Sequence, residues 1–368
     1  MTGRWTGLVL LCLSASALAQ GLDKGPLFTL RPAWGYRAYV NEEFALKPTD
    51  HGQCEVEPAA GLVVCGVKTG KVLAFAKDAG ELVWSFKTRG SVRTRPAFDN
   101  GQLFVGSSDG CLYRLDAQSG RPTWPRPYCT DAAIYGGPVV SGDTVLFSVT
   151  INKIYAVSGN DGRFLWEYHR DRPRFMSAEG VASPAVEDDR VYVGFSDGAL
   201  VALVQGKPVW TADLGVDVQQ KDVDATPVLD GEVLYTAAFG QGPAAVRKSD
   251  GHVLWRGRFF GCTRPQVHGD RLVFGTADGE VVAAKKDDGA VLWVMKMDEG
   301  AAYQPVVVAD VVIAGGDRGL YSMDWRSGFP LELLAIPYGV RSTLTLDGRR
   351  LFFVGGGGTV NAVDIEAR

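Results

Sequence analysis

The chain of 368 residues is 46% hydrophobic and contains 46 glycines, a composition that suits a large core joined by many tight turns. Its formal net charge is -4, with acidic and basic residues interspersed, which argues against nucleic acid or an anionic lipid surface as a partner. The length alone suggests two domains, but a repeat continues through the sequence without a linker. We therefore expect one domain from residue 20 to residue 368.

The first 19 residues have the pattern of a secretory signal peptide. Arg4 provides a basic start, residues 8–13 are apolar, and Ala17-Leu18-Ala19 is a small-x-small cleavage site before Gln20. The apolar stretch is too short to span a bilayer. We expect an exported protein, and lipid attachment at Cys12 remains an alternative.

A short β-prone segment follows, residues 27–30 with Trp34, and it stands before the first complete repeat. The repeat itself is an apolar run, a polar turn, a second apolar run and then Gly-x-x-x-Trp. Such a phrase predicts strand, turn, strand, glycine-containing turn and strand. The six tryptophans that end the copies are Trp84, Trp124, Trp166, Trp210, Trp255 and Trp293.

Two further copies lack the tryptophan. Residues 311–324 lead to Glu332 at the tryptophan position, and residues 351–364 reach the end of the sequence without a last strand. The early segment around Trp34 could supply that strand. The sequence therefore predicts an all-β fold, an eight-bladed β-propeller of four-stranded antiparallel blades, with the last blade closed by the N-terminal strand and almost no helix.

The recurring tryptophan has a structural interpretation. One large ring after the same turn in each unit would lock a blade onto the next, burying apolar area while its N–H group finds a backbone acceptor. Six equivalent rings cannot all face a ligand, so we do not expect any of them to stack on a cofactor.

Five cysteines follow the signal peptide. Cys54 and Cys65 lie symmetrically about one turn, and Cys111 and Cys129 about another, so each pair could face across antiparallel strands. We predict two disulfides, with small buried hydrophobes as the alternative. Cys262 is left over, and no Cys-x-x-Cys motif occurs.

Motifs for catalysis or metal binding are weak. Residues 106–110 and 194–198 match Gly-x-Ser-x-Gly, but they lie in predicted turns between strands, whereas a nucleophile elbow joins a strand to a helix. The four histidines are spread over different units without a His-x-x-x-His pair. We predict no catalytic, cofactor-binding or metal-binding residues and no cofactor.

Two resemblances extend this interpretation. The stretch 115–124, Leu-Asp-Ala-Gln-Ser-Gly-Arg-Pro-Thr-Trp, resembles the pyrroloquinoline-quinone-type propeller repeat. More narrowly, residues 180–227 resemble the BamB family of the outer-membrane β-barrel assembly machinery. The shared features are the shortened turn in 202–210, with Gln-Gly before Lys-Pro-Val-Trp, and Asp-Val-Asp-Ala-Thr-Pro at 222–227.

The BamB resemblance implies a partner and a site. It implies that Asp222 and Asp224 help bind the periplasmic POTRA domains of the barrel-inserting, BamA-like subunit. The long polar loop before them, with Gln219, Gln220 and Lys221, would belong to the same surface. The alternative is turn chemistry, in which the aspartates cap backbone N–H groups.

A second family element aligns poorly. The family has Leu-x-Leu-Arg where this chain has Met176-Ser-Ala-Glu179, so a carboxylate replaces a guanidinium and reverses the sign of any ion pair made there. We include Met176 and Glu179 in the expected partner surface.

The resemblance implies a non-catalytic scaffold in the periplasm that assists assembly of outer-membrane β-barrel proteins. It would associate with the inner face of the outer membrane through other subunits of the machinery. Two alternatives stay open: a periplasmic quinoprotein-like oxidoreductase, and a propeller that binds a ligand or polymer. Quinoprotein dehydrogenases carry an adjacent Cys-Cys pair, which does not occur in this sequence.

Overall fold

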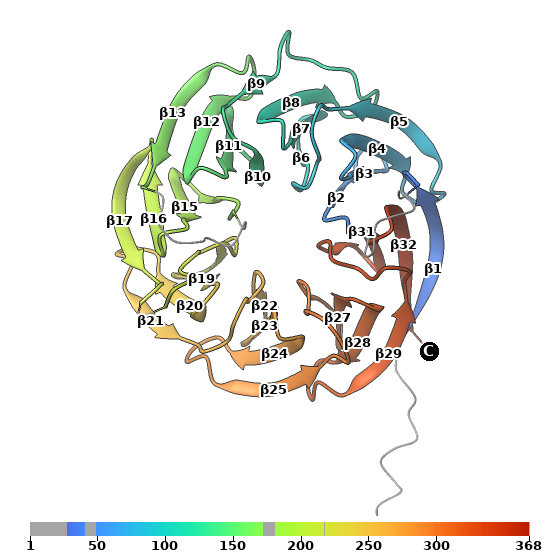
Figure 1. Ribbon diagram of the computed structural model, residues 1–368, viewed down its shortest axis with the longest axis vertical. Helices are drawn as coiled ribbons and strands as arrows, with labels where there is room; N and C mark the ends of the chain where they lie inside the picture. The colour runs from blue at the N-terminus through green and yellow to red at the C-terminus, as the bar shows by residue number, and fades with distance from the viewer. Residues whose placement is uncertain (1–27, 41–48, 172–180, 217, 368) are drawn as a thin grey trace, which may run out of the picture.

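The computed structural model describes residues 28–40, 49–171, 181–216 and 218–367. Within these ranges every regular secondary-structure element is a β-strand. The 32 strands form eight four-stranded antiparallel sheets arranged around a ring (Figure 1). The predicted all-β, eight-bladed propeller is therefore confirmed. The signal peptide expected at residues 1–19 lies outside the described residues.

The first four blades follow each other in chain order. Blade 1 comprises β2 (Cys54–Glu57), β3 (Leu62–Gly66), β4 (Lys71–Ala76) and β5 (Leu82–Lys87). Blade 2 comprises β6 (Ala97–Asp99), β7 (Gln102–Gly106), β8 (Cys111–Asp116) and β9 (Tyr128–Cys129). Blade 3 comprises β10 (Ile134–Ser141), β11 (Thr144–Val149), β12 (Lys153–Ser158) and β13 (Phe164–His169). Blade 4 comprises β14 (Ala185–Glu187), β15 (Arg190–Gly194), β16 (Ala199–Val204) and β17 (Lys207–Asp213).

The second half of the ring continues the pattern. Blade 5 comprises β18 (Val228–Asp230), β19 (Val233–Ala238), β20 (Gly242–Arg247) and β21 (Val253–Arg256). Blade 6 comprises β22 (Gln266–His268), β23 (Arg271–Gly275), β24 (Glu280–Lys285) and β25 (Val291–Lys296). Blade 7 comprises β26 (Val306–Val308), β27 (Val311–Gly316), β28 (Gly319–Asp324) and β29 (Pro330–Ala335). Blade 8 comprises β30 (Thr345–Asp347), β31 (Arg350–Val354), β32 (Thr359–Ala367) and β1 (Phe28–Arg37).

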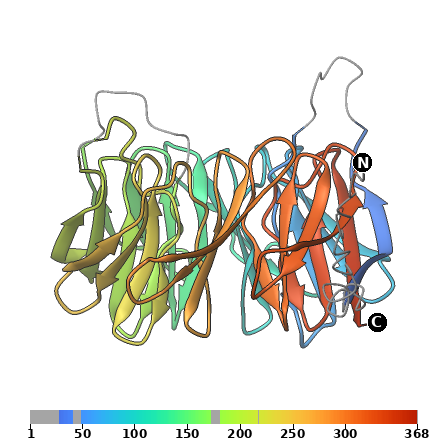
Figure 2. The same ribbon diagram turned by 90° about the horizontal axis from the view of Figure 1, so that it is seen from below.

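The last blade joins the two ends of the described chain. β1 pairs with β32 in an antiparallel register that runs from Phe28 opposite Ala367 to Arg37 opposite Thr359. The strand order β30-β31-β32-β1 then has the same sense as the other blades, with the first strand at the central channel and the fourth on the rim (Figures 1 and 2). The N-terminal segment therefore supplies the strand that the sequence lacked at its other end.

The core lies between neighbouring blades. The second strand of blade 1, β3, is buried along its whole length, whereas the rim strand β5 is largely exposed. Both faces of a middle strand are covered by adjacent blades, so its sequence is a continuous apolar run rather than an alternation. The junction of blades 1 and 2 shows the arrangement, since it packs Val64, Val72, Ala74 and Trp84 against Leu103, Val105 and Leu115.

Each repeated tryptophan reaches across such a junction. The indole Nε1 of Trp84 in blade 1 donates to the carbonyl oxygen of Ala117 in blade 2 at 3.0 Å. Its ring lies on Gly120, the glycine of the next Gly-x-x-x-Trp, where a Cβ atom would be 2.4 Å from the ring. The repeated glycine is therefore the receptor surface for the tryptophan of the preceding blade, and its positive φ of 67° also favours glycine.

The same contact recurs around the ring. Trp166 packs on Gly206, and the other Nε1 donations run from Trp34 to Lys77, Trp124 to Gly159, Trp210 to Lys248, Trp255 to Lys286 and Trp293 to Trp325. Trp34 of β1 acts as one more member of this set. Sequence reasoning did not include it because Leu30, not glycine, stands four positions before it.

Blade 2 departs from the predicted unit. Trp124 lies before β9 rather than in a strand, and β9 is only two residues long. Pro122, Pro125 and Pro127 explain the difference, because proline has no N–H group to donate to the strand ladder. Between β8 and the segment just before β9, the only β-bridge is the one that joins Leu115 to Pro122.

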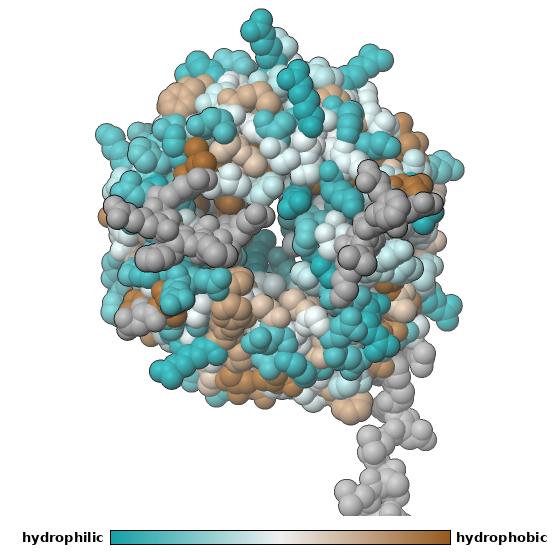
Figure 3. Space-filling view, viewed as in Figure 1, coloured by the Kyte–Doolittle hydropathy of each residue, from teal (hydrophilic) through white to brown (hydrophobic). Residues whose placement is uncertain are grey.

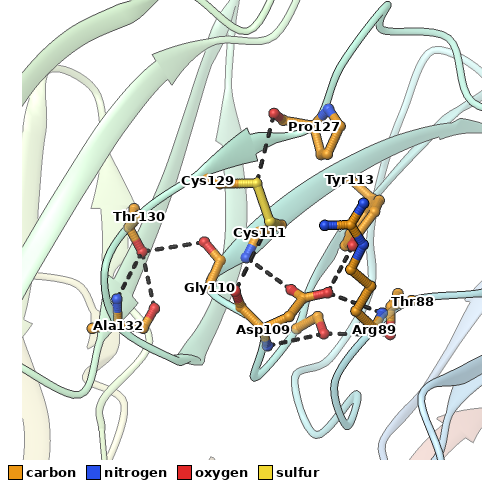
Figure 4. Close-up of a disulfide and its surroundings, with 11 residues drawn as sticks. Thr88, Arg89, Asp109, Gly110, Cys111, Tyr113, Pro127, Cys129, Thr130 and Ala132 are labelled. Carbon is orange, nitrogen blue, oxygen red and sulfur yellow. Dashed lines mark hydrogen bonds between the residues drawn. A yellow bond between two sulfur atoms is a disulfide. The ribbon is translucent and has the colours of Figure 1, made fainter.

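The four paired cysteines form the disulfides Cys54–Cys65 and Cys111–Cys129. Each joins residues directly opposite one another, the first in β2 and β3 and the second in β8 and β9. Beside the second disulfide, the Asp109 carboxylate accepts from the Cys111 N–H group at 2.9 Å and from the Tyr113 hydroxyl at 2.7 Å (Figure 4).

Cys262 has no disulfide partner and is buried. Burial raises the pKa of its thiol, so this cysteine stays protonated near neutral pH. It lines the central cavity with little exposure, 4%, and behaves as a small hydrophobic residue.

Candidate partner-binding site

The aspartates singled out in the sequence lie in the connection between β17 of blade 4 and β18 of blade 5. We call residues 214–227 the acidic loop. Asp222 and Asp224 share it with Gln219, Gln220 and Lys221, so five of the seven expected site residues belong to one segment. Met176 and Glu179 lie outside the described residues.

The acidic loop is held between two turns. On the blade 4 side its backbone is fixed by donation from Leu214 N to Gly198 O at 2.8 Å and from Val223 N to Phe195 O at 3.0 Å. On the blade 5 side, Phe239 N donates to Asp222 O at 2.8 Å and Gly240 N donates to Gln220 O at 2.9 Å. These bonds satisfy the backbone of a long connection and give it a defined path.

Asp222 is an interior residue of this loop. It is 1% exposed and lies beside Val223, also 1% exposed, and Ala225 at 5%. Its carboxylate therefore lies inside the loop and not on its surface. A partner that touches the present surface would not reach it directly.

Asp224 is half-buried and lines the central cavity. Its Oδ1 atom is inaccessible and has no hydrogen-bond donor among the described residues. Burial raises the pKa of Asp224 to about 7, and the neighbouring Asp222 adds to the rise while the backbone N–H groups of Asp224 and Ala225 oppose it. The Asp224 carboxyl group therefore accepts from backbone N–H groups, as the turn interpretation expects, and is also destabilised in its charged form by burial and by Asp222.

The exposed part of the loop is different in chemistry. Gln219 is exposed, Val216 is 41% exposed, and Gln220 and Lys221 are half-buried. These side chains, unlike that of Asp222, are available to a docking protein.

An aromatic pair borders the acidic loop. Phe239, whose N–H group bonds to the loop, meets the Phe260 ring edge-on with centroids 4.8 Å apart. Phe260 remains 43% exposed. Sequence reasoning missed it, although the signal was present as two consecutive phenylalanines, residues 259–260, in a connection between strands.

The serine turns offer no nucleophile geometry. In residues 106–110 the Ser107 side chain is fully buried, and the Ser108 hydroxyl accepts from the Ser91 N–H group at 2.7 Å. Gly110 has φ of 83°, as a tight hairpin turn requires. Among the residues that the structure describes, no three His, Cys, Asp or Glu side chains are grouped so that they could hold a metal ion, and no helix is long and apolar enough to cross a membrane.

Comparison with known proteins adds a family. The family model described as outer membrane protein assembly factor BamB matches residues 68–294 and 204–367. These matches together extend over most of the ring. The chain belongs to the BamB family.

A curated BamB-family relative, the outer membrane protein assembly factor BamB of Yersinia pestis, is 27% identical over 246 residues. The alignment covers 61% of this chain and 62% of the relative, so the match spans less than two thirds of that protein's length.

Solved structures share the fold. BamB from Moraxella catarrhalis superimposes with a TM-score of 0.79 at 21% identity, covering 91% of this chain and 100% of the other. Quinohemoprotein alcohol dehydrogenase from Comamonas testosteroni gives a TM-score of 0.69 at 15% identity, covering 92% and 77% respectively. At these identities the likeness concerns the propeller architecture alone.

Proposed function

We propose that this protein is a non-catalytic periplasmic scaffold that assists outer-membrane protein assembly by binding the POTRA domains of the barrel-inserting subunit. It acts at the inner face of the outer membrane through that subunit and other members of the machinery. The observation that carries the proposal is the BamB family match over residues 68–294 and 204–367.

The binding surface that we propose is the exposed side of the acidic loop together with Phe260. The turns on both sides fix the loop backbone, so docking would cost little ordering entropy. Phe260 offers an aromatic anchor of the kind that dominates binding energy at interfaces. Asp222 and Asp224 act behind this surface by setting the path of the loop.

The first test compares two phenylalanines of similar exposure. Phe260→Ser should weaken binding of purified POTRA domains at least about tenfold, or ~1.4 kcal/mol, in a calorimetric titration. Phe164→Ser is the matched control, because Phe164 is 46% exposed but lies on β13 at the outer rim. Equal affinities for the two variants would remove the proposed surface.

The second test addresses the aspartates. Asp222→Ala combined with Asp224→Ala should reduce recovery of the barrel-inserting subunit from envelope extract, because the loop loses its internal supports. Thermal melting of the same variant shows whether the ring stays folded. A folded variant with unchanged recovery would contradict a role for the pair in partner binding.

The oxidoreductase alternative has one observation in its favour, the shared architecture with a quinohemoprotein dehydrogenase. Added pyrroloquinoline quinone and calcium should produce no absorbing complex and no dye reduction with the purified protein. Stoichiometric binding with dye reduction would replace the scaffold proposal.

A further inference from the structure

The ring encloses a cavity of about 880 Å³ along its central channel. The space-filling view shows the opening at the centre of the molecule (Figure 3). Six blades contribute an equivalent residue to its wall. In each blade a proline precedes or lies within the innermost strand, and the wall residue stands just before that proline: Arg95, Gly137, Ser183, Thr226, Arg264 and Gln304. Proline fits there because the channel side of an inner strand needs no N–H donor.

Two of these equivalent positions carry arginine, and their surroundings differ. Arg95 forms an ion pair with Glu55, which lines the same cavity. Arg264 is half-buried and has no carboxylate within ion-pair distance among the described residues. Its Nε atom is inaccessible and lacks an acceptor in the described part of the chain.

The electrostatic surroundings of Arg264 do not compensate its charge. Burial lowers the pKa of Arg264, and the like charge of Arg95 lowers it further. A guanidinium remains protonated under these conditions. A desolvated cation without a counter-charge is costly, and a bound anion would offset that cost.

Two further arginines lie behind this wall, Arg93 beside Gln53 and Tyr135, and Arg341 two residues before Thr343. The Nε atoms of Arg93 and Arg341 are inaccessible and without acceptors among the described residues. Arg341 pairs with Asp317 at 3.0 Å, while the Arg93 guanidinium lies 5.4 Å from the Tyr135 ring centroid. Burial lowers the pKa of His51, and the charges of Arg93 and Arg341 lower it further, while Asp50 and a backbone hydrogen bond to Arg341 oppose the shift.

We propose that the central channel binds a small molecule carrying an oxyanion, a carboxylate or a phosphate, on Arg264, with Arg95, which is paired with Glu55, as a neighbouring hydrogen-bond donor. The planar guanidinium fork matches such groups with paired charge-assisted hydrogen bonds. Gln53, Gln304, Thr263 and Thr343 line the same cavity and supply neutral polar groups. The cavity volume lies in the usual range for small-molecule sites. Glu55, Glu57 and Asp224 also line it, and Glu55 forms the ion pair with Arg95.

The experiment titrates the purified protein with sodium phosphate and, separately, with sodium citrate at constant ionic strength, using calorimetry. Saturable binding of phosphate alone assigns a phosphate ligand, and binding of citrate alone assigns a carboxylate ligand. Binding of both supports the shared oxyanion chemistry. Absence of saturable binding for both overturns the proposal.

Variants locate the site. Arg264→Gln should weaken binding of the active anion at least about tenfold, and Arg264→Lys should retain part of the affinity because it keeps the charge without the fork. Arg326→Gln is the control, since the Arg326 side chain is 76% exposed outside the channel. The melting temperature in chloride shows that each variant is folded. Wild-type affinity in a folded Arg264→Gln variant would overturn the assignment.

Discussion

Two kinds of blade junction hold the ring together. Within the described chain, seven junctions are crossed by a tryptophan, and the junction between blades 7 and 8 is crossed by Glu332 instead. The Glu332 carboxylate accepts from the Leu30 N–H group of β1 at 2.9 Å, whereas an indole donates to a carbonyl oxygen. The direction of the hydrogen bond is therefore reversed at the junction where the N-terminal strand closes the ring.

The two kinds share one backbone geometry. Trp84 lies opposite Ala74 beside a register shift between Ala74 and Phe75, and Glu332 lies opposite Ser322 beside the equivalent shift between Ser322 and Met323. The irregularity aims the side chain at the next blade in both cases. What differs is the crossing side chain, which adds apolar burial in the case of Trp84 and a charge-assisted hydrogen bond in the case of Glu332.

The largest effect is expected from removing an indole. Trp84→Ala should lower the free energy of unfolding by about 3–5 kcal/mol, because it empties a packed junction and leaves the Ala117 carbonyl without its donor. Urea denaturation measures the change. Leu82→Ala, at a 41% exposed position of the same strand, should change it by less than about 0.5 kcal/mol. Similar losses for the two variants would contradict the locking role.

The glycine receptor should be nearly as sensitive. Gly120→Ala should cost about 2–3 kcal/mol, since the new Cβ atom meets the Trp84 ring at 2.4 Å in addition to the strain of a positive φ. Gly101→Ala isolates the strain, because Gly101 has φ of 74° with nothing within 4 Å of a Cβ atom. The difference between the two denaturation midpoints measures the ring contact, and no difference would exclude it.

The stability of the junction of blades 4 and 5 should depend on pH through Asp224. The pKa of Asp224 is about 7 in the folded protein against 3.8 as its ordinary value, so the folded state holds the proton more tightly. Stability is therefore greatest below about pH 4 for this group and decreases as the pH rises through 7, by a few kcal/mol. In Asp224→Asn, the denaturation midpoint should no longer show the decrease between pH 4 and pH 8 that Asp224 causes in the wild type.

The control for that titration is Asp270→Asn, because the Asp270 side chain is 84% exposed. Its pH profile should follow the wild type. An unchanged profile in Asp224→Asn would show that the carboxyl group does not titrate in this window.

The smallest effect concerns the carboxylate junction. Glu332→Gln keeps an acceptor oxygen for Leu30 but loses the charge, so we expect a loss of about 0.5–1 kcal/mol in the same urea assay. Glu366→Gln serves as the comparison, since its ion pair with Arg31 is solvent-exposed and worth less. A larger loss for Glu366→Gln would reverse our ranking of the two carboxylates.

The architecture could be predicted because every blade repeats the same local pattern. The Gly-x-x-x-Trp phrase specifies a turn, a strand and a junction contact together, and even the incomplete last copy indicated that β1 must pair with β32. Blade 2 was less predictable, because the three prolines around Trp124 interrupt strand pairing without altering the repeat spacing.

The candidate site was less accessible to sequence reasoning. The Asp-Val-Asp pattern located the acidic loop, but it could not show that Asp222 is interior or that Phe260 lies beside it through Phe239. The burial of these side chains and the composition of the channel wall depend on which blades lie next to one another in the folded ring. Arg95 and Arg264 are of this kind, since each is unremarkable in its own repeat.

The pairing of β1 with β32 also has a consequence for folding. Leu30 of β1 lies opposite Ile365 of β32, so β1 cannot complete its blade until the two ends of the described chain are together. Until then β1 presents an open strand edge, which is prone to mispairing. Closure of the ring is a long-range step of the slow class, because it joins strands from opposite ends of the described chain.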